Sequence, residues 1–229
     1  MSQRFILIGP PACGKGTQGR RLAKALGLEY LSTGALLREH MARESEIGNL
    51  AKPILDRGGY LPDGLMCGII EQWLESASEG WVLDGFPRSV PQADFLEEVL
   101  ERVGRPLTAA IAFEAPFDVL KTRIWQRVEC PDCRWSGGAQ EARSKACPEC
   151  GAVVEVRADD DLENFTSRYE AYCRSALPLV DAYRQKKLLC SCDATRSRDE
   201  VTAELMQHFA PAANGGLSSL SSSNNDSSQ

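Results

Sequence analysis

A glycine-rich segment directly after the first apolar run places the strongest constraint on the fold. The sequence GPPACGKGT, residues 9–17, follows the apolar residues 5–8 and leads into a helical stretch. A strand, then Gly-x-x-x-x-Gly-Lys, then a helix is the pattern of a phosphate-binding loop, because glycines let backbone N–H groups turn toward an anion. Lys15 supplies a point charge, and the helix that begins near Gly16 adds its positive dipole end. The alternative is an ordinary tight turn between a strand and a helix.

Apolar runs that alternate with amphipathic stretches predict an α/β fold. The predicted strands are residues 4–8, 29–31, 81–83, 109–113 and 188–192. Helical spacing between them implies a parallel sheet with helices on both faces, in which ligands bind at the carboxyl ends of the strands. Two segments interrupt the pattern: 32–59 is helical without an obvious strand, and 128–156 carries paired cysteines.

Four of the nine cysteines form two Cys-x-x-Cys pairs. These are Cys130, Cys133, Cys147 and Cys150. Four thiolates at this spacing suit a tetrahedral Zn²⁺, and the site would be structural because protein fills every ligand position. The alternatives are four thiols without metal, or two disulfides.

The net charge and the lengths of the apolar runs limit the kinds of partner that the chain is expected to bind. The formal net charge is −6, which argues against general nucleic-acid binding. No apolar run is long enough to span a bilayer, and the N-terminus shows no signal-peptide pattern, so we expect a cytoplasmic protein without a membrane partner. The Ser- and Asn-rich residues 211–229 lack the apolar content to fold and are predicted to form a disordered tail.

Six motifs of this sequence resemble, in the same order, the motifs of the adenylate kinases, which belong to the nucleoside monophosphate kinase family. The resemblance spans about residues 4–209, and its zinc-type segment with four cysteines is similar to the long-lid form. The motifs are GPPACGKGT (9–17), STGALLR (32–38), GGYLPD (58–63), GWVLDGFPRSVPQA (80–93), RIWQR (123–127) and RADDDLENFTSRYEAY (157–172).

This resemblance implies a three-layer phosphate-loop fold, with a core of five parallel strands and two inserts. It also implies reversible, Mg²⁺-dependent phosphoryl transfer from ATP to AMP, which gives two ADP and serves adenine nucleotide homeostasis. The resemblance further implies a monomer. The implied division is a core of residues 1–31, 62–122 and 161–210, an AMP-binding insert at 32–61, and a lid at 123–160 with the four-cysteine zinc site.

The resemblance also implies residues on the ATP side. Mg²⁺, mostly through water, would be held by Thr17 and Asp84. ATP itself would be bound by Ala12, Cys13, Gly14, Lys15, Gly16, Thr17, Arg123, Arg127 and Arg196.

On the AMP side, arginines suit the phosphate because a guanidinium makes bidentate contacts. Gln92 would read the adenine edge, because its amide can donate and accept together. The implied AMP-binding residues are Thr33, Arg38, Gly59, Tyr60, Leu61, Gly85, Phe86, Pro87, Arg88, Gln92, Arg157 and Arg168. The implied catalytic residues are Lys15, Arg88, Arg127, Arg157 and Arg168.

The chain departs from the family pattern at several positions. Ala35 replaces the aspartate of the STGD motif, which removes a carboxylate near the AMP phosphate. Ala12 replaces a glycine where a positive φ is expected, at some cost in strain. Gln126 and Val128 replace Gly and Arg at the entry to the lid.

Three alternatives stay open at this point. The first is a UMP or CMP kinase, against which Gln92 and the long cysteine-bearing lid argue. The second is a nucleotide-binding sensor that has lost catalysis, motivated by Ala12 and Ala35. The third is a zinc-ribbon nucleic-acid binder, which the acidic charge disfavours.

Overall fold

The structure is a computed structural model that describes residues 2–57, 59–142, 145–157 and 160–210; the predicted disordered tail lies outside these residues. Five parallel strands form the central sheet in the spatial order β2-β3-β1-β4-β8. The prediction of a five-stranded parallel sheet is therefore confirmed, and each strand end lies within one residue of its predicted place. The strands are β1 (Arg4–Ile8), β2 (Glu29–Ser32), β3 (Trp81–Asp84), β4 (Ala109–Glu114) and β8 (Leu189–Asp193).

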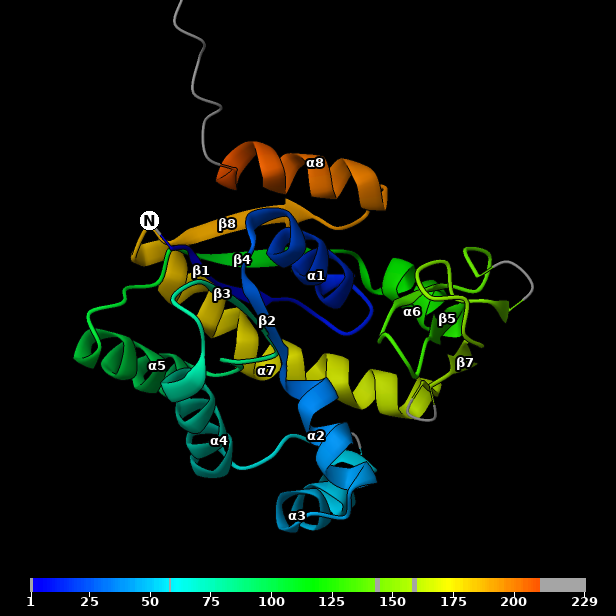
Figure 1. Ribbon diagram of the computed structural model, residues 1–229, viewed down its shortest axis with the longest axis horizontal. Helices are drawn as coiled ribbons and strands as arrows, with labels where there is room; N and C mark the ends of the chain where they lie inside the picture. The colour runs from blue at the N-terminus through cyan, green and yellow to red at the C-terminus, as the bar shows by residue number, and fades with distance from the viewer. Residues whose placement is uncertain (1, 58, 143–144, 158–159, 211–229) are drawn as a thin grey trace, which may run out of the picture.

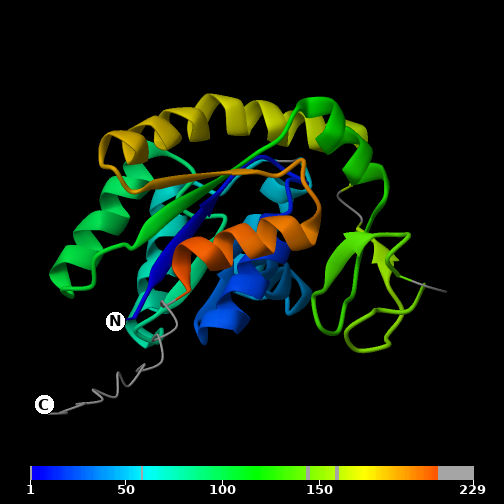
Figure 2. The same cartoon turned by 90° about the horizontal axis from the view of Figure 1, so that it is seen from above.

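Helices cover both faces of this sheet, so the body has three layers (Figures 1 and 2). On one face pack α4 (Asp63–Ser76), α5 (Val90–Arg102) and most of α7 (Leu162–Gln185). On the other face pack α1 (Lys15–Leu26) and α8 (Arg198–Phe209). Figure 2 shows α7 and α8 on opposite sides of the strands.

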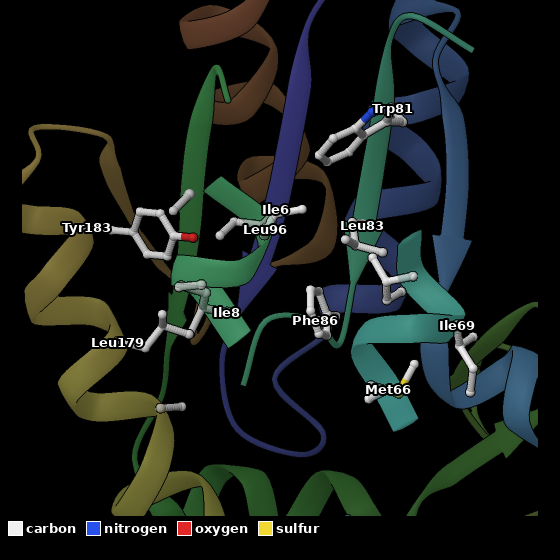
Figure 3. Close-up of a cluster of buried hydrophobic side chains, with 14 of the residues drawn as sticks. Ile6, Ile8, Met66, Ile69, Trp81, Leu83, Phe86, Leu96, Leu179 and Tyr183 are labelled. Carbon is white, nitrogen blue, oxygen red and sulfur yellow. The ribbon is translucent and has the colours of Figure 1, made fainter. Parts of the chain in front are cut away.

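The central strand β1 explains the two covered faces. Its side chains alternate: Ile6 and Ile8 join the cluster under α4, α5 and α7, whereas Phe5 and Leu7 join the cluster under α1 and α8. A strand buried on both faces is apolar without interruption, as β1 is after Arg4. Figure 3 shows the first cluster, in which Trp81 and other large side chains meet.

Two smaller lobes project from the body (Figure 1). One is a pair of helices, α2 (Thr33–Ala42) and α3 (Glu46–Leu55), which agrees with the predicted helical segment after residue 32. The other follows α6 (Phe117–Trp125) and contains a small antiparallel sheet in the order β6-β5-β7. Its strands are β5 (Arg127–Glu129), β6 (Ser136–Gly138) and β7 (Glu155–Val156).

The longest helix, α7, spans from the body toward the second lobe (Figure 1). It buries Phe165 near its start and Tyr183 near its end, so it packs along its whole length. Among the described residues, no helix is both long enough and apolar enough to cross a membrane.

Candidate active site

The glycine-rich segment forms a loop at the carboxyl end of β1 and leads into α1. Gly14 immediately precedes the helix in a left-handed conformation, with φ of 94°. The Lys15 ammonium lies against the loop and donates to the carbonyl oxygens of Gly9 at 2.6 Å and Pro10 at 2.8 Å. The loop therefore has the strand–loop–helix context that the phosphate-binding pattern requires.

This loop lines a first cavity of about 620 Å³. All nine residues predicted on the ATP side line the cavity, and so does Asp84. Several charged groups from other elements complete the wall. They are Arg20, Arg38, Arg88, Glu129, Arg134, Glu141, Arg157, Arg168 and Arg198.

Asp84 lies at the carboxyl end of β3, next to the loop. Its carboxylate oxygen Oδ2 accepts a hydrogen bond from the Tyr30 hydroxyl at 2.9 Å. Burial, followed by the charge of Asp84, raises the pKa of Tyr30 well above its usual value, so the phenol stays a donor. A Cβ added at Gly16 would lie 3.4 Å from the same oxygen, so the start of α1 lies next to the carboxylate. A carboxylate so placed suits Mg²⁺-bound water.

A second cavity, of about 610 Å³, lies between α2, α4 and the small antiparallel sheet of the second lobe, called the lid sheet below. It adjoins the first, because five predicted residues line both cavities: Arg38, Tyr60, Arg88, Arg157 and Arg168. Four further predicted residues line only the second cavity: Thr33, Gly59, Leu61 and Gln92.

The turn after β3 positions Arg88 between the two cavities. Gly85 has φ of 91°, and a Cβ there would lie 2.4 Å from Thr33 Oγ1, so only glycine fits. Arg88 Nε donates to the carbonyl oxygen of Gly85 at 2.6 Å, and its guanidinium lies 4.2 Å from the centre of the Tyr60 ring. These contacts fix the direction of the guanidinium.

Gln92 supports the same turn. Its Oε1 accepts from the backbone N–H of Arg88 at 2.8 Å, and its Nε2 donates to Asp63 Oδ1 at 2.7 Å. The amide is buried, yet it lines the second cavity. One of its two N–H groups is used by Asp63, so adenine recognition would use the other.

Three neighbouring residues predicted to bind AMP take different places in the turn. Gly85 and Pro87 line the first cavity. Phe86 lines neither cavity; its side chain is fully buried in the apolar cluster of Figure 3. Phe86 therefore offers a nucleotide its backbone alone.

Two of the lid arginines that line the first cavity are paired with carboxylates. Arg127 forms a two-pronged ion pair with Asp160, in which Nε lies 2.6 Å from Oδ2 and Nη2 contacts Oδ1. The Asp160 side chain is completely buried, so this pair anchors β5 to the segment before α7. Arg157 Nε lies 3.4 Å from the carboxylate of Glu129.

The predicted ATP-side residues Arg123 and Arg196 lie at the rim of the first cavity. Arg123 Nη2 donates to the carbonyl oxygen of Thr195 at 3.5 Å. Arg196 forms an ion pair of 2.7 Å with Glu204. The structure thus brings together a phosphate loop, a carboxylate suited to Mg²⁺ and arginines from α1, α2, the turn after β3, the lid, α7 and the start of α8. Such a site can hold two phosphate chains and neutralise the charge between them.

Comparison with known sequences agrees with this chemistry. A sequence model of the family described as Adenylate kinase matches residues 7–188 of the chain. The chain belongs to the adenylate kinase family.

Individual relatives cover most of the chain. The adenylate kinase of Caldanaerobacter subterraneus subsp. tengcongensis is 37% identical over 207 residues, which are 88% of this chain and 94% of that protein. The adenylate kinase of Methanosarcina acetivorans is 37% identical over 214 residues, or 91% of this chain and 99% of that protein. That of Archaeoglobus fulgidus is 35% identical over 209 residues, or 88% and 95%.

As in the predicted adenylate kinase lid, the four paired cysteines converge. The Sγ atoms of Cys130, Cys133, Cys147 and Cys150 all lie within 4.8 Å of one another. The two shortest separations are 3.5 Å, which excludes a disulfide bond of about 2.05 Å. Tetrahedral Zn–S bonds of about 2.3 Å place sulfur atoms about 3.8 Å apart, so the cluster fits a zinc ion.

Two departures from the adenylate kinase pattern lie at the first cavity. Ala12 has φ of 62°, the left-handed conformation that glycine adopts without strain. Ala35 lies in the first turn of α2, where its N–H is 3.4 Å from the capping hydroxyl of Ser32. Both residues line the first cavity.

Sequence reasoning missed several groups at the site. Glu129 and Asp160 form the ion pairs described above, and Tyr30 holds Asp84. The carbonyl oxygen of Ser136 in the lid accepts from the hydroxyl of Thr17 at 3.1 Å. One local signal existed: Glu129 comes two residues after Arg127 in a strand, so the two side chains leave the same face.

Proposed function

We propose that the chain transfers the terminal phosphoryl group of ATP to AMP, reversibly and with Mg²⁺, to give two ADP. The observation that carries this proposal is the pair of adjoining cavities, one built on the phosphate loop and one on α2 and α4, with arginines shared between them. Each cavity has the size range of a small-molecule site. The names of the relatives do not favour the UMP or CMP kinase or the catalytically inactive sensor.

The proposed roles follow from position. Lys15 and the loop amides hold the ATP phosphates, and Thr17 with Asp84 holds Mg²⁺, mostly through water. Arg88 and Arg38 hold the AMP phosphate from the body and from α2. The remaining catalytic groups, Arg127, Arg157 and Arg168, stabilise the charge that develops on the transferring phosphoryl group.

The proposed division into working parts follows the two lobes. Residues 32–61 close over AMP, and residues 123–160 close over ATP, while the body of 1–31, 62–122 and 161–210 stays fixed. Closure excludes water, which would otherwise accept the phosphoryl group. A structural Zn²⁺ on the four cysteines keeps the lid in shape.

The same proposal covers the setting in which the enzyme works. It acts as a monomer in the cytoplasm, and it binds ATP, AMP and ADP without a nucleic-acid or membrane partner. The net charge of −6 supports the absence of a nucleic-acid partner.

The test is ADP formation from ATP with AMP, CMP, UMP and GMP as acceptors, with zinc measured in the same sample. We expect AMP to be preferred by at least about tenfold in kcat/KM, or about 1.4 kcal/mol. Preference for UMP or CMP would contradict the proposal, and tight binding of AMP without turnover would favour the sensor.

A matched pair of lysine variants links the activity to the phosphate loop. Lys15→Met should lower kcat by about 10²- to 10³-fold, because it removes a cation from the transferring phosphate. Lys24→Met changes an exposed lysine at the other end of α1 and should leave kcat unchanged. Equal effects of the two variants would reject the assigned role of Lys15.

A further inference from the structure

A lid carboxylate lies among the arginines that the proposed function assigns to the AMP phosphate. Glu129, at the end of β5, points one oxygen at Arg38 Nη2, 3.3 Å away, and the other at Arg157 Nε, 3.4 Å away. Its side chain is only 13% exposed. Arg38 belongs to α2 and Arg157 to the lid, so the carboxylate joins the two lobes.

The position of Glu129 matches the place where the two cavities meet. Glu129 lines both cavities, as do Arg38 and Arg157. A two-oxygen anion between two guanidinium groups has the contacts that a phosphate would make with them. The family pattern carries its carboxylate at position 35, on α2; here Ala35 has none, and Glu129 supplies a carboxylate from the opposite lobe.

We propose that Glu129 sets the affinity of the site for AMP, because its carboxylate competes with the AMP phosphate for Arg38 and Arg157. The inference rests on the proposed function for its choice of AMP. To bind, the AMP phosphate must displace the carboxylate from both guanidinium groups, and a displaced Glu129 stays close enough to repel it. Glu129 therefore weakens AMP binding and leaves ATP binding largely unchanged, because Lys15 and the loop amides lie outside its ion pairs.

The decisive variant is Glu129→Gln, which keeps the shape and removes the charge. We expect KM for AMP, and the dissociation constant of AMP measured by calorimetry without ATP, to fall by about fivefold, the scale of a partly exposed ion pair. KM for ATP and kcat should change by less than about twofold, well within the scatter of exposed pairs. Added salt screens the attraction between AMP and the arginines in both proteins, but in the parent it also screens the competing Glu129 pairs, so KM for AMP should rise more steeply with salt in the variant.

The matched control is Glu155→Gln. Glu155 is exposed, stands opposite Glu129 in the lid sheet and also lines the second cavity, so Glu155→Gln removes the same charge one strand away and keeps both ion pairs of Glu129. Its KM for AMP should stay nearer to that of the parent. Glu129→Asp keeps the charge but shortens the reach, and it should fall between the parent and Glu129→Gln.

Several results would overturn the inference. If Glu129 instead holds the two arginines in place for AMP, Glu129→Gln will raise KM for AMP or lower kcat. An unchanged dissociation constant for AMP in a variant with normal zinc content and melting temperature would also reject it. If Glu129→Gln does not fold, Glu129→Asp decides: a KM for AMP equal to or above that of the parent rejects the inference. Failure of the proposed function is separate, because it would appear as AMP binding without ADP formation in the parent protein.

Discussion

The body and the lid bury very different amounts of apolar surface. The body packs large side chains on both faces of its sheet, among them Trp81, Phe5 and Phe113. The buried cluster of the lid contains one large side chain, Trp135, with small residues and two of the paired cysteines. A unit with so few apolar residues needs another source of stability, such as a bound metal. The difference in packing predicts that the body is held by its apolar core and the lid by metal coordination.

The largest effect should come from removing a metal ligand. Cys147→Ser takes away one buried thiolate, so zinc binding weakens and the lid loses its fixed arrangement. Arg127 and Arg157 then lose their positions, and kcat/KM should fall by at least about 100-fold. The thermal transition of the body should persist. Zinc analysis, ADP formation and calorimetry check the three parts of this prediction.

Cys67→Ser is the control for that variant, because Cys67 is half-buried on α4, away from the quartet. It should retain zinc and most of the activity. Full activity of a zinc-free Cys147→Ser protein would show that packing alone holds the lid, and the comparison would fail.

A substitution that leaves a void in the core of the body should lower the free energy of unfolding without changing the zinc content. Leu83 on β3 is completely buried, so Leu83→Ala should lower the free energy of unfolding by about 2–5 kcal/mol. Zinc content should not change, because the coordination site belongs to the other lobe. Urea denaturation measures the first quantity and metal analysis the second.

Leu50→Ala supplies the matched control, because Leu50 on α3 is 54% exposed. This substitution should lower the free energy of unfolding by less than about 0.5 kcal/mol. Loss of zinc from Leu83→Ala in the folded protein would mean that the two lobes are not stabilised independently.

The smallest effect concerns Ala12 in the phosphate-binding loop after β1. Ala12→Gly relieves about 1–2 kcal/mol of left-handed strain but adds about 0.4–1 kcal/mol of freedom to the unfolded chain. We expect a net gain of at most about 1.6 kcal/mol in the free energy of unfolding. Ala25→Gly, at an exposed position inside α1, should cost about 1 kcal/mol instead. The opposite signs, measured in urea, make the test sharp; two losses of equal size would refute the strain.

The sequence predicted the body well because its signals are local. The uninterrupted apolar run of β1 and the loop after it lie within fourteen residues of one another, so pattern and spacing suffice. The meeting of the four cysteines was also predictable, because metal geometry dictates it.

What could not be predicted depends on contacts between distant segments. Glu129 meets Arg38 across 91 positions of the chain, and Gln92 meets Asp63 across 29. Phe86 lies within a motif that faces the cavity, yet its side chain points into the core. Only the packing of one element against another decides which way such side chains turn.

The ion pair between Arg127 and Asp160 has a thermodynamic consequence. The carboxylate of Asp160 already fixes the guanidinium of Arg127 when the chain folds, and Arg127 lines the first cavity. In the proposed function, a phosphate that binds Arg127 does not have to immobilise a long, freely rotating side chain, which ordinarily costs about 0.5–1.5 kcal/mol. A mobile surface arginine would lose side-chain conformational entropy each time it bound a phosphate. Arg127 loses that entropy once, when the chain folds.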